Sequence, residues 1–307
     1  EIVELVPGTD VSRSQHQGLL ARELARQAVL LSAREELGLA TRDQALREGD
    51  EKDARGKLAL SVQITFEKSG NVVLELQRID GKKRQSLFKS EKEFAKRDTL
   101  DYVALSAWLT ELARGEIAAT LRKTAAVPAD EKVERPAASG ESPIEELPKE
   151  IIEQLRRMTF ASQFAAVRRL HELLRRTGDS AANGALVRGY ANLAVLSELY
   201  WHPASAAFKA RALLYAQRQA AAASANGAAD VNAVSLAHHH FGYALTLCGL
   251  HHAALGEFAA AKQAIDAPRP EWATVAANLC EFNHAALAEV PLASEQGEIA
   301  RVCMVLM

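Results

Sequence analysis

The sequence has little cysteine, few aromatic residues and no long apolar run. It contains 3 cysteines in 307 residues, and aromatic side chains make up 6%. These cysteines lie far apart and form neither a C-x-x-C pair nor a zinc-binding cluster. No apolar stretch approaches the roughly 18 residues that cross a bilayer. The sequence therefore excludes a disulfide-rich scaffold and a zinc ribbon, and it predicts a protein without a membrane span.

A strong excess of either charge sign is also missing. The formal net charge is −2, because 37 basic residues are nearly balanced by 39 acidic ones. Residues 1–127 carry 21 basic against 20 acidic side chains, and residues 149–307 carry 14 against 13. Neither region has the positive excess that general binding to nucleic acid requires. We therefore expect no nucleic-acid partner.

Motifs that carry catalysis or cofactor binding are absent from the sequence as well. It has no G-x-S-x-G, no phosphate-binding glycine loop and no H-E-x-x-H. His238, His239 and His240 are consecutive, and on a helix such side chains point about 100° apart, so the three cannot share one metal ion. We expect no metal, no cofactor and no enzymatic activity. An enzyme whose site forms between two domains stays open as an alternative.

Two regions of different periodicity flank a proline-rich segment. Residues 124–143 hold three prolines, no aromatic residue and mostly small or charged side chains, a composition typical of a linker. Residues 1–123 predict a small α+β domain in the order strand, helix, three meandering strands, helix. Residues 144–307 predict helices separated by short breaks, and therefore an all-α domain of antiparallel helical hairpins.

The helical region repeats part of its own sequence. Leu247–Phe258 recurs as Leu279–Val290, with seven of twelve positions identical at an offset of 32 residues. Self-similarity at this period is typical of stacked helical hairpins. Cys248 and Cys280 occupy equivalent positions of the repeat, where we expect small buried side chains. A disulfide between them is the alternative.

Around Gly242 the chain resembles a tetratricopeptide repeat. Gly242 and Ala254 lie where the two helices of that repeat cross, and Phe258 and Ala261 follow at the family's spacing. The resemblance covers roughly residues 150–292, and the rival is a generic α-α solenoid. It implies a concave groove, lined by the first helix of each hairpin, that holds a protein or peptide partner. The positions that it assigns to this groove are His239, Tyr243, Thr246, Glu271, Val275 and Asn278.

A basic cluster surrounds the predicted hairpin over residues 82–97. It offers an alternative function, the binding of nucleic acid or of a lipid surface. Because Glu91, Glu93 and Asp98 are interleaved with the cations, we interpret the lysines as protection of an edge strand. The cluster consists of Lys82, Lys83, Arg84, Lys89, Lys92, Lys96 and Arg97.

Both ends of the chain carry expectations of their own. Residues 299–307 are apolar on nearly all sides, whereas the terminal helix of a repeat protein usually has a polar outer face. We expect either further repeats beyond this point or self-association through this helix, and covering by another element is the alternative. The start at Glu1, without methionine, predicts a processed or trimmed product.

The sequence predicts a non-enzymatic scaffold for protein–protein interaction. The order of elements in residues 1–123 loosely resembles small α+β domains at the front of bacterial envelope-assembly proteins. This resemblance and the alanine- and proline-containing linker favour a bacterial, extracytoplasmic location, periplasmic or in the cell envelope, over a cytoplasmic one.

Overall fold

The chain forms two compact units, Glu1–Glu134 and Arg135–Met307. The computed structural model describes residues 2–5, 15–43, 57–67, 70–94, 100–125, 147–177, 180–199, 202, 204–225, 230–294 and 296–306. The division between the units falls inside the predicted linker 124–143, of which only residues 124 and 125 are described.

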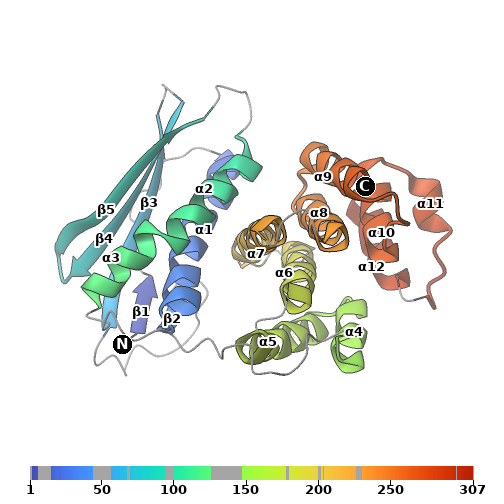
Figure 1. Cartoon of the computed structure of the whole chain (residues 1–307), viewed down its shortest axis with the longest axis horizontal. Helices are drawn as coiled ribbons and strands as arrows, with labels where there is room; N and C mark the ends of the chain where they lie inside the picture. The colour runs from blue at the N-terminus through green and yellow to red at the C-terminus, as the bar shows by residue number, and fades with distance from the viewer. Residues whose placement is uncertain are drawn as a thin grey trace. The chain divides into compact units, whose positions relative to one another are not determined.

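A mixed sheet forms the first unit (Figure 1). Its described strands lie in the order β2-β1-β3-β4-β5. β1 is parallel to both of its neighbours, whereas β3, β4 and β5 form an antiparallel meander. Gly81 closes the last hairpin with a positive φ of 58°, a backbone conformation that glycine adopts without strain. The strands are β1 (Ile2–Leu5), β2 (Ala40–Asp43), β3 (Lys57–Phe66), β4 (Asn71–Asp80) and β5 (Lys83–Glu93).

Helices cover one face of this sheet. α1 contacts β1, β3 and α2, and α3 contacts β5 and the η1 segment, so the helices share a side. Leu24 and Ala28 of α1 are buried, as are Leu105 and Leu109 of α2, as the apolar spacing predicts. The helical segments are α1 (Gln15–Leu31), the π-helical η1 (Ser32–Glu36), α2 (Tyr102–Arg114) and α3 (Glu116–Thr124).

The first unit departs from the sequence-based expectation in two places. The strand β2 was not predicted, because Ala40–Asp43 is short and mostly polar and its pairing with β1 is a tertiary contact. The last helix that the sequence predicts within residues 1–123 is interrupted at Gly115, which separates α2 from α3.

The regular elements of the second unit are all helices among its described residues. The sequence-based helices are confirmed with small shifts of their ends. The irregular spacing of the repeat copies also predicts an extended loop over residues 217–231. This prediction is wrong as far as Ala225, because the alanine-rich stretch continues α7. The helices are α4 (Lys149–Arg156), α5 (Phe160–Thr177), α6 (Ser180–Leu199), α7 (Ser205–Ala225), α8 (Val231–Leu247), α9 (His251–Ala264), α10 (Glu271–Cys280), α11 (His284–Ala288) and α12 (Gly297–Leu306).

Successive helices of this unit pair as hairpins. α4 contacts α5, α6 contacts α7, and α8 contacts α9, while the first helices also contact one another from α4 through α6 and α8 to α10. At the α8–α9 crossing, a Cβ on Gly242 would lie 2.6 Å from Cε1 of Phe258. The predicted close approach of the two helices at Gly242 is therefore confirmed. Cys248 and Cys280 are buried free thiols, as expected from their repeat position.

Candidate partner-binding site

The first helices of the hairpins, α4, α6, α8 and α10, form what we call the inner layer. In Figure 1 these helices follow one another in an arc, and α12 lies within it. α8 is at the centre of the layer because it contacts both α6 and α10. The Asp230 side chain caps its N-terminus by accepting a hydrogen bond from the Ala233 amide (2.9 Å), which fixes where the helix begins.

A chain of hydrogen bonds crosses the inner layer from α8 to α4. The Tyr243 hydroxyl donates to Oδ1 of Asn192 (2.6 Å), and Nδ2 of Asn192 donates to Oε1 of Gln163 (3.1 Å). Gln163 in turn donates through Nε2 to the carbonyl oxygens of Leu155 (2.9 Å) and Arg157 (2.8 Å). These carbonyls end α4 and have no partner within their own helix. Buried polar groups on three hairpins are thus satisfied together.

Aromatic rings and an arginine occupy the neighbouring part of the layer. The His240 ring stacks on Trp272 with centroids 4.6 Å apart, and Tyr243 meets the same indole edge-on at 5.5 Å. The Arg188 guanidinium lies over Trp272, 4.9 Å from the ring centroid. His240 fits here because a Cβ on Gly184 would lie 2.3 Å from its Cε1.

Burial controls the protonation of this cluster. Burial, and then the charge of Arg188, lower the pKa of His240 to about 3. Burial, followed by the charges of Arg269 and His238, lowers the pKa of His239 to about 4. Both rings are therefore neutral near pH 7. Burial also lowers the pKa of Arg188, and the nearby Arg156 acts in the same direction.

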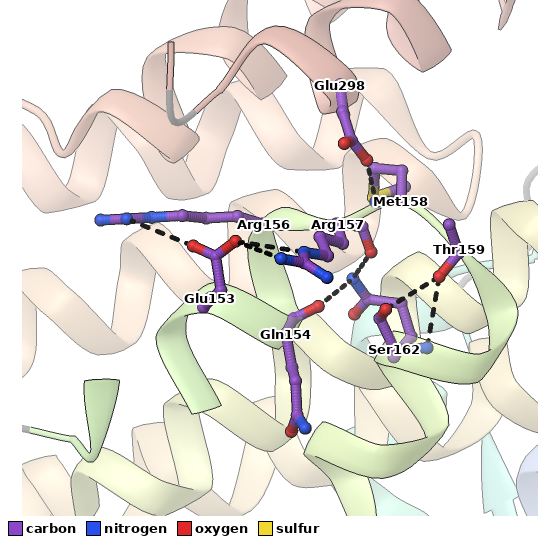
Figure 2. Close-up of polar contacts among 9 residues, drawn as sticks. Glu153, Gln154, Arg156, Arg157, Met158, Thr159, Ser162 and Glu298 are labelled. Carbon is purple, nitrogen blue, oxygen red and sulfur yellow. Dashed lines mark hydrogen bonds and ion pairs between the residues drawn. The ribbon is translucent and has the colours of Figure 1, made fainter. Parts of the chain in front are cut away.

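The helix α12 is held against the inner layer near its start and again at Cys303. At its start, the Glu298 carboxylate accepts a hydrogen bond from the Met158 amide (2.5 Å), in the turn between α4 and α5 (Figure 2). Further along, Cys303 is buried. Burial and, to a lesser extent, Cys303 raise the pKa of Tyr243, and burial and then Cys280 raise the pKa of Cys303 itself. α12 also contacts α10 and α11. One helix thus connects the first and last hairpins.

This arrangement corrects the expectation that α12 lacks a covering element. Ile299, Ala300 and Cys303 are buried. Val305 is 71% exposed and Leu306 is 38% exposed, so only the end of the helix presents apolar surface. Self-association through this end stays a prediction.

The structure separates the six predicted groove residues into two groups. Tyr243, Thr246, His239 and Val275 are buried, whereas Glu271 is exposed and Asn278 is half-buried. The Thr246 hydroxyl donates to the Gly242 carbonyl (2.8 Å) and lies 3.0 Å from Sγ of Cys280. Four of the six residues therefore lack the exposure that an open groove requires, because neighbouring helices and α12 cover the inner layer. Partner binding by these positions stays a prediction.

Several residues in this layer or bonded to it were missed by sequence reasoning. Arg188 and Asn192 follow Gly184 at intervals of four on α6, which places all three on one helical face. In an alanine- and leucine-rich helix, this polar stripe is a signal that could have been found. Trp272 and Gln163 carried no such signal, because their partners lie on other helices.

Histidines outside the aromatic cluster have simple structural roles. The His202 ring accepts a hydrogen bond from the Ala204 amide (3.2 Å) near the start of α7, and His238 is bonded to Glu257 (2.7 Å). Among the described residues, no group of three or more potential ligands could hold a metal ion. Across the same residues, every helix is too short or too polar to span a membrane.

The basic hairpin lies at the edge of the sheet. β5 is an outer strand, and Lys83, Lys89 and Lys92 are exposed on it, which fits the edge-protection interpretation. Lys96 and Arg97 lie outside the described residues.

Comparison with known proteins identifies no family for this chain. The sequence matches no protein-family model, and no curated protein sequence is similar to it.

Proposed function

We propose that the chain is a non-enzymatic scaffold that binds a protein or peptide partner on the inner layer of its second unit. The observation that carries the proposal is the way in which α12 packs on the inner layer. A helix of ten residues packs on this layer through small and apolar side chains and one charged hydrogen bond. A surface that holds one helix in this way has the chemistry that binds a helical segment from another chain.

The finer assignment, a tetratricopeptide-like solenoid, belongs to the same proposal. It is supported by the close contact of Gly242 with Phe258 and by the burial of Ala254 and Ala261. The series of contacts from α4 to α10 is also the pattern of a stack in which each hairpin contacts its neighbours.

The proposed contact region lies at the accessible end of the inner layer. Glu271 and Asn278 on α10 retain exposed surface, and Val305 and Leu306 present apolar surface on α12, which contacts α10. Apolar side chains bordered by polar ones are typical of protein-binding surfaces. A bacterial cell envelope, which the order of elements in the first unit favours, is the proposed setting.

Site-specific photo-crosslinking tests this function. A photo-reactive phenylalanine analogue would replace Asn278 on the inner layer, and Lys262, which is exposed on α9, would be the matched control. After irradiation in the native source, we expect a discrete protein adduct at position 278 and none at position 262. The captured protein should then bind the purified full chain in calorimetry.

Two results would contradict the proposal. One is the absence of any discrete adduct at position 278. The other is equal capture at both positions, because a partner held on the inner layer cannot reach an exposed side chain on α9 equally well.

A further inference from the structure

Arg188 is a cation in the inner layer without a counter-ion among the described residues. Its Nε is buried and has no hydrogen-bond partner, although the side chain as a whole is half-buried. The groups that act on its charge are the Tyr243 hydroxyl and the Arg156 guanidinium, and neither is a carboxylate. A desolvated guanidinium that is not paired is unfavourable for folding, so its position calls for a reason other than stability.

The aromatic side chains orient this guanidinium without using its donors. Arg188 lies over the ring of Trp272, and the His240 ring stacks on the same indole. A cation over a ring is held by the ring's quadrupole. Its N–H groups lie in the guanidinium plane and form a fork that matches a carboxylate or a phosphate.

A second cation strengthens the local positive potential. Arg156, at the end of α4, is close enough to lower the pKa of Arg188. Its ion pair with Glu153 is long, at 3.9 Å (Figure 2). Because His240 and His239 are neutral near pH 7, these two rings add no charge beside Arg188.

We propose that Arg188 is a binding residue for an oxyanion, either a carboxylate or a phosphate, with Arg156 contributing attraction. This inference rests on the proposed function and deepens it, since it names the group that a partner presents to the inner layer. An anion bound there would form charge-assisted, two-pronged hydrogen bonds with the guanidinium. It would also supply the missing counter-charge.

Anion-dependent thermal stability tests the site in the full chain. The purified protein would be unfolded in increasing succinate or inorganic phosphate, with sodium chloride keeping the ionic strength constant. Intrinsic tryptophan fluorescence, to which Trp272 contributes together with Trp108 and Trp201, would be followed in parallel. We expect a saturable rise of the melting temperature with at least one anion, and a matching fluorescence change. The anion that saturates identifies the class.

Two variants separate binding from folding. Arg188→Met should melt at the same or a higher temperature than the wild type in chloride, because it removes an unpaired buried charge, and it should lose the anion effect. Arg211→Met is the control, since Arg211 also lies over an aromatic ring, Tyr190, at 5.6 Å. It should keep the anion effect in full.

The inference is overturned if neither anion stabilises the wild type saturably, or if Arg188→Met keeps the effect. Its failure is distinguishable from failure of the proposed function. A partner that crosslinks at position 278 and binds Arg188→Met with unchanged affinity contradicts only the anion site. Saturable anion binding without any partner adduct contradicts only the scaffold.

Discussion

The missing side chain of Gly242 sets the distance between α8 and α9. The Phe258 ring fills the space where a Cβ would stand, and Phe258 is 2% exposed. Protein interiors are close-packed, so an added methyl group displaces the neighbouring side chains. The same logic applies at Gly184, against which the His240 ring packs.

Substitution of Gly242 by alanine should therefore destabilise the second unit. We expect a loss of about 1–3 kcal/mol in the free energy of unfolding, typical of overpacking, measured by urea denaturation. Gly256→Ala on α9 is the matched control, because no atom lies within 4 Å of its added Cβ. That control should gain about 0.5–1 kcal/mol from helix propensity. Equal effects of the two changes would contradict the packing argument.

The buried histidines should make stability depend on pH. The pKa of His240 is lowered to about 3 and that of His239 to about 4, whereas both are near 6.5 in the unfolded chain. The unfolded state therefore takes up protons first as the pH falls below 6.5. The contribution of the two neutral histidines to the free energy of unfolding should be fully present above that pH. It should decrease toward pH 4 by about 1.4 kcal/mol per pH unit for each histidine.

Urea denaturation at pH 7 and at pH 5 would measure this decrease. His240→Gln should reduce the slope of stability against pH, because one of the two groups no longer titrates. An unchanged slope in that variant would show that other groups cause the acid sensitivity.

At the scale of elements, α12 depends on a contact far away in the sequence. Glu298→Ala removes the acceptor of the Met158 amide, so we expect faster hydrogen exchange at Met158 and along α12. Glu298→Gln keeps a side-chain carbonyl acceptor and should have a smaller effect. Arg301→Ala, on the exposed face of the same helix, should leave the exchange rates unchanged; acceleration in that variant as large as in Glu298→Ala would contradict the role of the hydrogen bond.

Elements of this protein differ in how far the sequence determines them. The helices of the second unit were predictable because apolar spacing and breaks such as Gly249, with its positive φ of 78°, are local signals. The strand β2 was not predictable, because its four residues show no apolar alternation and form a strand only by pairing with β1. The surroundings of the predicted groove residues were not predictable. Tyr243 is buried because of contacts with Asn192 and α12, which are distant in sequence, and its role in partner binding stays a prediction.

At the scale of the molecule, the two units should fold separately. Each has its own buried core, and the clustering of contacts divides the chain at residue 134. We expect residues 1–134 and residues 135–307, produced as separate chains, each to show the circular dichroism and a cooperative unfolding transition of a folded domain. The sum of their unfolding curves should reproduce that of the whole chain. A fragment that unfolds without a transition would contradict this independence.

The hydrogen bond between Glu298 and Met158 also affects how the second unit unfolds. In a linear stack, each end hairpin has a single neighbour, and fraying starts there. In the second unit, α12 is hydrogen-bonded to the turn that follows α4. Neither the first nor the last hairpin can therefore unfold without breaking a contact with the opposite end of the unit. The second unit should consequently resist gradual opening from its termini and lose its structure in a single step.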